Sequence, residues 1–178
     1  TKKFIEEAKA KGQPFYLMNN STDPHRPFHN SNQEKTKAGK KAGKAKTRKA
    51  AKQGAKAEGG DAEAVETGSS AEPSRVYTAA EIKPWGYLPD LPAIREEIAQ
   101  YFSSVRRCDD TLGAMMRAVK DAGVEENTLV IFLSDNGPSF PFSKANCYPV
   151  STRTPLIVRW PGHIKPGLKD ANNMVCTI

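Results

Sequence analysis

The chain has 178 residues, enough for one domain, and carries a formal net charge of +7 at pH 7. It contains no apolar run of the roughly 20 residues that a membrane-spanning helix needs, and no amino-terminal signal pattern. Its three cysteines have neither the spacing of a metal site nor the even number of a disulfide framework, which excludes both as the basis of the fold. The sequence opens within a helical pattern and stops within an apolar segment, so we expect an internal piece of a longer protein.

The positive charge is concentrated in one segment. Between residues 33 and 60, ten Lys or Arg stand against two Glu, which leaves 17 basic and 18 acidic residues in the rest of the chain. The remainder is therefore close to neutral. Its charge does not favour a nucleic-acid-binding function for the globular part.

The beginning of the chain predicts a helix, a strand and a polar loop. An amphipathic pattern over residues 4–11 predicts a helix that ends at Gly12. The apolar residues 15–18 predict a short buried strand. The loop that follows contains His25 and Arg26, which can bind an anion. A lone loop histidine is also typical of a solvated or backbone-bonded side chain.

Residues 32–74 form a low-complexity segment, rich first in Lys, Ala and Gly and then in Glu, Gly, Ala and Ser. The segment has almost no large apolar side chains, so it cannot bury enough surface to offset the entropy lost on ordering. We therefore predict a disordered basic insertion, or a fluctuating Ala/Lys helix, between two parts of one domain, residues 1–31 and 75–178. A polybasic arm for a polyanion is the alternative, but no aromatic residue is interleaved for base stacking.

The part after the insertion predicts alternating helices and strands. Prolines and aromatic residues over 76–92 predict an extended, packed loop. Apolar residues recur at helical spacing over 93–122, and Gly123 is the expected carboxyl-terminal cap. Residues 128–133 predict a strand that is apolar on both faces, and residues 155–160 predict another. We therefore expect an α/β fold, part of a mostly parallel sheet with helices on both faces.

A polar cluster, Asp135-Asn136-Gly137, follows the first of these strands directly. Parallel α/β sheets bind their ligands at the carboxyl ends of the strands. Asp135 and Asn136 offer the hard oxygen ligands that Ca²⁺ and Mg²⁺ prefer. The same tripeptide is typical of a tight turn, so the residues alone leave both interpretations open.

Five ordered blocks of the sequence together resemble the sulfatase family, and most closely its heparan N-sulfatase branch. The resemblance covers about 135 residues, all of the chain except the low-complexity segment. Five blocks in order are far more specific than any one motif. The blocks are Asp23-Pro24-His25-Arg26-Pro27-Phe28, Tyr87-Leu88-Pro89-Asp90-Leu91-Pro92, Ser134-Asp135-Asn136-Gly137, Phe140-Pro141-Phe142-Ser143-Lys144-Ala145-Asn146 and Thr154-Pro155-Leu156-Ile157-Val158-Arg159-Trp160-Pro161-Gly162.

The resemblance implies an enzyme of the alkaline phosphatase superfamily that hydrolyses sulfate esters or sulfamates on sulfated glycans. It implies that Asp135 and Asn136 bind Ca²⁺, with Mg²⁺ as the alternative, and that Lys144 binds the sulfate group and takes part in catalysis. It also implies a periplasmic, secreted or lysosome-like location. The substrate class and the location rest on the resemblance alone.

The resemblance further implies a sulfate-contacting histidine in the loop of His25 and Arg26. The family's usual active histidine lies three residues earlier, where this chain has Thr22, and His25 matches the second histidine of the pattern. The family's nucleophile is a formylglycine, made by a maturation enzyme from a Cys/Ser-x-Pro-x-Arg motif. Residues 147–151 lack the arginine of that motif and lie downstream of the metal motif. We therefore expect the nucleophile upstream of this chain, and we expect the chain alone to be inactive.

Two other functions remain open. A phosphoester or phosphonate hydrolase of the same superfamily would use the same metal-binding rim. A non-catalytic polyanion-binding protein would act through the basic residues 35–56. The upstream motif separates the first alternative from a sulfatase, and deletion of residues 32–74 tests the second.

Overall fold

The structure is a computed structural model that describes residues 1–36, 71–173 and 175. The chain divides into two compact units. The first comprises Thr1–Asn19 and Thr111–Ile178, and the second comprises Asn20–Asp110. No helix within the described ranges is long and apolar enough to cross a membrane.

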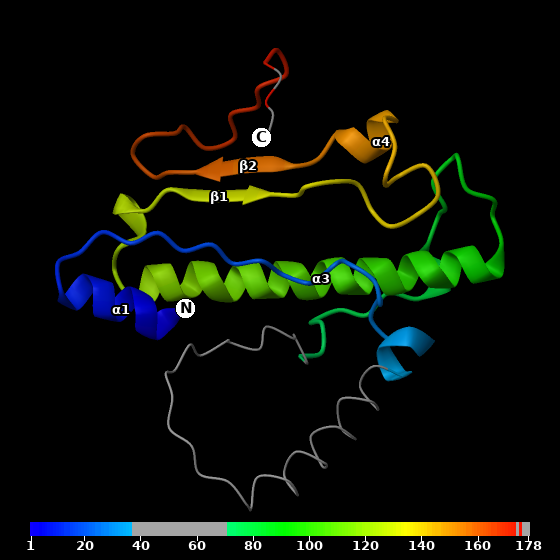
Figure 1. Ribbon diagram of the computed structural model, residues 1–178, viewed down its shortest axis with the longest axis horizontal. Helices are drawn as coiled ribbons and strands as arrows, with labels where there is room; N and C mark the ends of the chain where they lie inside the picture. The colour runs from blue at the N-terminus through cyan, green and yellow to red at the C-terminus, as the bar shows by residue number, and fades with distance from the viewer. Residues whose placement is uncertain (37–70, 174, 176–178) are drawn as a thin grey trace, which may run out of the picture. The chain divides into compact units, whose positions relative to one another are not determined.

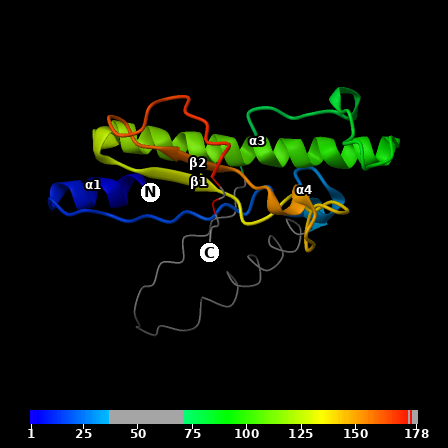
Figure 2. The same cartoon turned by 90° about the horizontal axis from the view of Figure 1, so that it is seen from above.

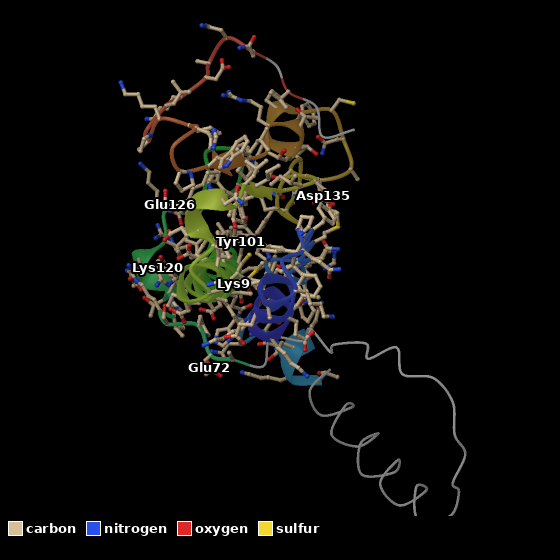
Figure 3. All side chains as sticks on the ribbon, turned by 90° about the vertical axis from the view of Figure 1, so that its left-hand side faces the viewer. Lys9, Glu72, Tyr101, Lys120, Glu126 and Asp135 are labelled. Atoms are coloured by element: carbon tan, nitrogen blue, oxygen red, sulfur yellow. The ribbon has the colours of Figure 1, made fainter. Side chains whose placement is uncertain are left out.

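In the first unit, α1 (Lys2–Ala10) packs on the last turns of α3 (Pro92–Asp121). Ile5 of α1 is fully buried in a small apolar core. Lys9 Nζ donates a hydrogen bond of 2.5 Å to the carbonyl of Ala122, and Figure 3 shows Lys9 between the two helices. The core consists of Ile5, Ala118, Val119 and Ala122, with Phe15 and Val124 packed against it.

The boundaries of both helices agree with the sequence prediction. The helical periodicity predicts a helix over residues 93–122, and α3 runs from Pro92 to Asp121. The helix is followed by Gly123 at φ +64°, in the left-handed region that favours glycine, and its N–H donates to the Lys120 carbonyl at 2.8 Å. Gly12 at φ +61° likewise follows α1. Both predicted helix stops are confirmed.

The first unit also contains the sheet of the described residues, which has two strands. β1 (Val130–Leu133) pairs with β2 (Leu156–Arg159), as Figure 1 shows, and the same pair is seen from above in Figure 2. The strands are antiparallel, with Val130 opposite Arg159 and Leu133 opposite Leu156. The strand β1 is entered through a short 3-10 helix, η2 (Glu125–Asn127).

The expected parallel arrangement is wrong for this pair. The connection between the strands contains only one short helix, α4 (Pro149–Thr152), whereas a parallel crossover normally carries a helix long enough to return the chain across the sheet. The run before Asp135 is also not buried on both faces, since Ile131 is 54% exposed and Leu133 is 48% exposed. The mixture of helices and strands expected of an α/β fold is present, but this sheet is small and antiparallel.

Residues 15–18 do not form the expected buried strand. They are not assigned to any strand, and Tyr16 is 79% exposed and Met18 is 66% exposed. An apolar run with strand composition becomes a strand only when a partner strand and a buried face are available. The expected parallel sheet therefore lacks this strand in the part of the chain that the structure describes.

The second unit is built on the first turns of α3 and the segment 76–92 before it. That segment is extended, as predicted, and is interrupted by a 3-10 helix, η1 (Ala79–Glu81). Its packing is partial, since Ile82 is buried and most of its other residues are exposed. The N–H of Tyr77 fastens it to α3 by donating to the Ser103 hydroxyl at 3.0 Å. Edge-to-face ring contacts with centroid separations of 5.4 to 6.3 Å fill the space between them; they join Phe28, Tyr77, Trp85, Tyr101 and Phe102.

Most of the predicted insertion, residues 37–70, lies outside the described residues. Of its flanks, residues 32–36 are helical. The Ser74 hydroxyl donates to Asp110 Oδ1 at 2.7 Å, which fastens the other flank to α3. The boundaries of the insertion and its disorder stay a prediction.

Candidate functional site

The Asp135–Asn136 pair lies in the loop that leaves β1, as the sequence predicts. Two backbone hydrogen bonds hold this loop against the segment before β2. The Ser134 N–H donates to the Pro155 carbonyl at 3.3 Å, and the Gly137 N–H donates to the Ser151 carbonyl at 3.0 Å. Asp135, labelled in Figure 3, is exposed, and Asn136 is half-buried. The loop therefore presents a carboxylate and an amide side by side on a fixed backbone.

Gly137 is the residue that lets two backbone segments meet at this point. A Cβ atom at position 137 would overlap the carbonyl oxygens of Val150 and Ser143. Its φ is not in the left-handed region, so the requirement is for space and not for conformational freedom. The turn after β1 is consequently closed against the start of α4.

Lys144 lies in the next loop, whose backbone is fixed by local hydrogen bonds. Ser143 is fully buried, and its N–H donates to the Phe140 carbonyl at 3.1 Å. The Asn146 Nδ2 donates to the Lys144 carbonyl at 3.0 Å. Among the described residues, no carboxylate forms an ion pair with the Lys144 ammonium. The half-buried side chain is thus held at its base and carries a charge that can meet an external anion.

The chemistry of this loop fits a hard divalent cation, but only as part of its ligand shell. Ca²⁺ takes six to eight oxygen ligands. The Asn136 Nδ2 donates to the Gly137 carbonyl at 2.7 Å, so its amide oxygen is the atom left to bind a cation. The described residues contain no group of three or more His, Cys, Asp or Glu that could hold an ion. Asp135 and Asn136 can therefore supply two ligands, and the rest must come from elsewhere.

In the second unit, His25 is exposed and its imidazole is held by the backbone. The backbone N–H of His25 donates to the Thr22 carbonyl at 2.9 Å, and the ring Nδ1 lies 2.7 Å from the Arg26 carbonyl oxygen. Since a carbonyl can only accept, Nδ1 carries the hydrogen. The other ring nitrogen, Nε2, is then a proton acceptor whenever the ring is neutral. This contact agrees with the alternative of a backbone-bonded side chain, and it leaves Nε2 available as a base; the substrate-contacting role of His25 stays a prediction.

Arg26 is anchored beside it. Its guanidinium forms an ion pair of 2.5 Å with Glu97 and lies 4.5 Å from the centroid of the Phe28 ring. The side chain is about one third exposed. The planar guanidinium is therefore oriented by a carboxylate on α3 and by an aromatic face.

A buried ionic cluster that the sequence analysis missed lies next to this loop. The Arg107 guanidinium donates to both oxygens of Asp23, from Nε at 2.7 Å and from Nη2 at 2.8 Å. Its Nη1 donates to Glu34 at 2.9 Å and lies 3.4 Å from His29 Nδ1. The hydrogen bond with Asp23 raises the pKa of Arg107 above its ordinary value.

The sequence feature that could have indicated this cluster is a break in the apolar pattern of α3. Ser103, Ser104 and Arg107 are all buried, at positions where the helix faces its own unit. A run of polar residues on a buried helix face indicates partners that must be supplied by distant parts of the chain. The sequence alone does not say which ones.

Neither described cysteine has the features of an activated nucleophile. Cys147 is exposed just before α4, and its motif lacks the expected arginine. Burial raises the pKa of the Cys108 thiol, which disfavours the reactive thiolate. Taken together, Asp135, Asn136 and Lys144 lie in one compact unit, and His25 and Arg26 lie in the other.

Comparison with known proteins gives one consistent result. A family model described as Sulfatase matches residues 1–176. Human N-sulphoglucosamine sulphohydrolase is 42% identical over 79 residues, which are 44% of this chain and 16% of that protein. Human arylsulfatase A is 38% identical over 77 residues, covering 36% of this chain and 15% of that protein. An ulvan-active sulfatase of Formosa agariphila is 27% identical over 84 residues, covering 47% and 14%. The chain thus matches about one sixth of the length of these relatives.

Proposed function

Because the chain belongs to the sulfatase family, we propose that the protein hydrolyses sulfate esters or sulfamates, with sulfated glycans as its substrates. The observation that carries this proposal is the extent of the family match. It runs from residue 1 to residue 176 and so includes the Asp135–Asn136 loop, the Lys144 loop and the His25–Arg26 loop. The similarity to a sulphohydrolase that is named for N-sulphoglucosamine supports the sulfamate alternative.

In this proposal, the first unit would supply two cation ligands and one cationic side chain for the sulfate group. Asp135 and Asn136 would hold Ca²⁺, or alternatively Mg²⁺, through side-chain oxygens, and further ligands would come from outside this chain. The bound ion would supply positive charge to the sulfate oxygens. Lys144 would add a second positive charge, which neutralises the charge that develops on the oxygens in the transition state. Its lack of an ion-paired carboxylate within the described residues supports this role.

The second unit would contact the substrate through His25 and Arg26. Arg26 would contact a sulfate oxygen through its guanidinium, which is oriented by Glu97 and by the ring of Phe28. His25 would accept or return a proton at Nε2, because Nδ1 is committed to the Arg26 carbonyl. Thr22 stands where the family usually has its active histidine, and His25 matches the second histidine of the family pattern.

The remaining parts of the proposal lie outside the chain. The nucleophile would be a formylglycine upstream of residue 1, made by a formylglycine-generating or equivalent maturation enzyme. The proposed location is periplasmic, secreted or lysosome-like. An upstream Cys/Ser-x-Pro-x-Arg motif in the full-length sequence supports the assignment, and its absence would favour a phosphoester or phosphonate hydrolase.

The test is a hydrolysis assay on the full-length protein with 4-nitrophenyl sulfate, N-sulfoglucosamine and 4-nitrophenyl phosphate. We expect Asp135→Ala and Lys144→Ala each to lower kcat/KM for the sulfated substrates by about 100-fold or more, because each removes charge stabilisation from the transition state. The exposed residues Asp121 and Lys165 provide matched controls as alanine variants. A chelator should abolish activity and added Ca²⁺ should restore it. Equal rates in the site and control variants would reject the assigned roles.

A further inference from the structure

We propose that Arg107 is a positioning residue for the loop that carries His25 and Arg26. The inference rests on the proposed function, because it concerns how the substrate-contacting loop of the second unit is held. It starts from the buried cluster of Arg107 with Asp23, which no substrate-contacting role explains.

The contact between Arg107 and Asp23 has the geometry of a specific clamp. Two parallel N–H groups of the guanidinium meet the two oxygens of one carboxylate, at 2.7 and 2.8 Å. The Arg107 side chain is 8% exposed and the Asp23 side chain is 4% exposed. A two-point contact of this kind fixes the direction of the carboxylate as well as its distance, which a lysine cannot do.

The second end of the same loop is fastened one helical turn away. The His29 N–H donates to the Ser104 hydroxyl at 2.8 Å, and Phe28 is 1% exposed. Ser104 and Arg107 are three residues apart on α3 and therefore lie on the same face of the helix. The chain from Asp23 to His29 is thus held at both ends, and His25 stands exposed between the two anchors.

Stability alone does not account for this arrangement. A buried ion pair often contributes little net stability, since its attraction must offset the loss of hydration of both charges. Here one guanidinium also faces a second carboxylate, Glu34, and the ring of His29. What the clamp provides is a single direction for the segment after Asp23, which carries His25 and Arg26, the proposed substrate contacts.

The experiment compares two neighbouring arginines in the full-length protein. Arg107→Lys keeps the charge and loses the two-point contact. Arg106→Lys makes the same change one position earlier, at a side chain that is 41% exposed and pairs with Asp109 and Asp110. We expect Arg107→Lys to lower kcat/KM for 4-nitrophenyl sulfate by about tenfold or more, because small misplacements of contacting groups are costly. The Arg106→Lys protein should stay within about twofold of the wild type.

Two further measurements separate positioning from a general loss of structure. Hydrogen–deuterium exchange should rise in residues 23–29 of the Arg107→Lys protein and stay unchanged in α1, and unchanged exchange in the loop would overturn the proposal. In a His25→Ala background, Arg107→Lys should lower kcat/KM by less than in the wild type, because one of the two groups being positioned is gone. Losses that simply multiply would also overturn it.

A substitute variant and the exchange measurement keep the proposal testable if Arg107→Lys does not fold or if the wild type has no sulfatase activity. Should Arg107→Lys not fold, Asp23→Asn removes the charge from the other partner at nearly the same shape and takes its place in all three measurements. A wild type without sulfatase activity would reject the proposed function. Faster exchange in residues 23–29 of its Arg107→Lys variant would still support the clamp. Unchanged exchange with an active wild type would reject the clamp alone.

Discussion

At the scale of single residues, Glu81 is a carboxylate whose ionisation is tied to local structure. It accepts hydrogen bonds of 2.9 Å from both the N–H and the hydroxyl of Thr78, and one of 2.8 Å from the Arg75 guanidinium. The backbone hydrogen bond from Thr78 is the largest of the causes that lower the pKa of Glu81 to about 2. Because the ionised form is favoured in the folded state, Glu81 links the stability of η1 to pH.

This linkage has a defined sign and pH window. A depressed folded-state pKa contributes stability above the unfolded value, near 4.5, and the contribution is lost as pH falls toward about 2. We therefore expect the difference in Tm between the wild type and Glu81→Gln to be constant above about pH 5 and to shrink between pH 4.5 and 2. Thermal unfolding of the full-length protein at several pH values measures it. The exposed Glu126 provides the control as Glu126→Gln, and an equal pH trend in both variants would contradict the assignment.

At the scale of elements, the exit of β1 is fixed by contact between backbones. The turn after the strand contacts the start of α4 and the loop before it. Because Gly137 has no Cβ atom, the carbonyl oxygens of Val150 and Ser143 can approach its backbone closely. The same contact sets the position of the neighbouring Asp135 and Asn136. A substitution that moves these backbone segments apart should therefore lower the stability of the protein and disturb the proposed cation site.

We expect Gly137→Ala to destabilise the protein by roughly 1–3 kcal/mol, because the added methyl group has no space unless the backbone moves. Gly86→Ala is the matched control, since a Cβ atom at position 86 meets nothing within 4 Å. Urea unfolding measures the free-energy difference between the two variants. The Gly137 variant should also need more Ca²⁺ for half-maximal activity. Equal stability of the two alanine variants would show that the backbone contact is looser than described.

The elements that could be predicted from the sequence are those fixed by nearby residues. The limits of α3 follow from its apolar period and from Gly123, and the oxygen-rich turn after β1 follows from residue types alone. The pairing of β1 with β2 could not be predicted, because strand direction depends on how the connecting chain returns. The clamp between Asp23 and Arg107 was also beyond reach, since its partners lie 84 positions apart and share no motif.

At the scale of the whole molecule, the two flanks of residues 37–70 lie next to each other within the second unit. His29 Nδ1 lies 3.7 Å from Glu34 Oε2, just before residues 37–70, and His29 Nε2 lies 3.3 Å from Glu72 Oε2, just after them. One imidazole therefore meets carboxylates from both flanks. A short linker can join the flanks without displacing either of them.

Replacement of residues 37–70 by a short Gly/Ser linker should leave the fold and the proposed sulfatase activity intact. The change removes nine Lys or Arg and four Asp or Glu, which lowers the formal net charge of this chain from +7 to +2. We expect earlier elution from a sulfated-polysaccharide column, with kcat/KM for 4-nitrophenyl sulfate within about twofold of the wild type. Loss of column retention with activity untouched would assign the segment a separate binding role, whereas loss of activity would contradict its treatment as an insertion.

The small β1–β2 sheet affects the tendency of the isolated polypeptide to self-associate in solution. Ile131 and Ile157 are 54% and 60% exposed, and within the described ranges each strand has a partner on one edge only. Unpaired strand edges next to exposed apolar side chains can pair with strands of other molecules. We therefore expect residues 1–178, produced by themselves, to self-associate as their concentration rises. Ile131→Lys or Ile157→Lys should reduce this association and would help in preparing samples for crystallisation or NMR.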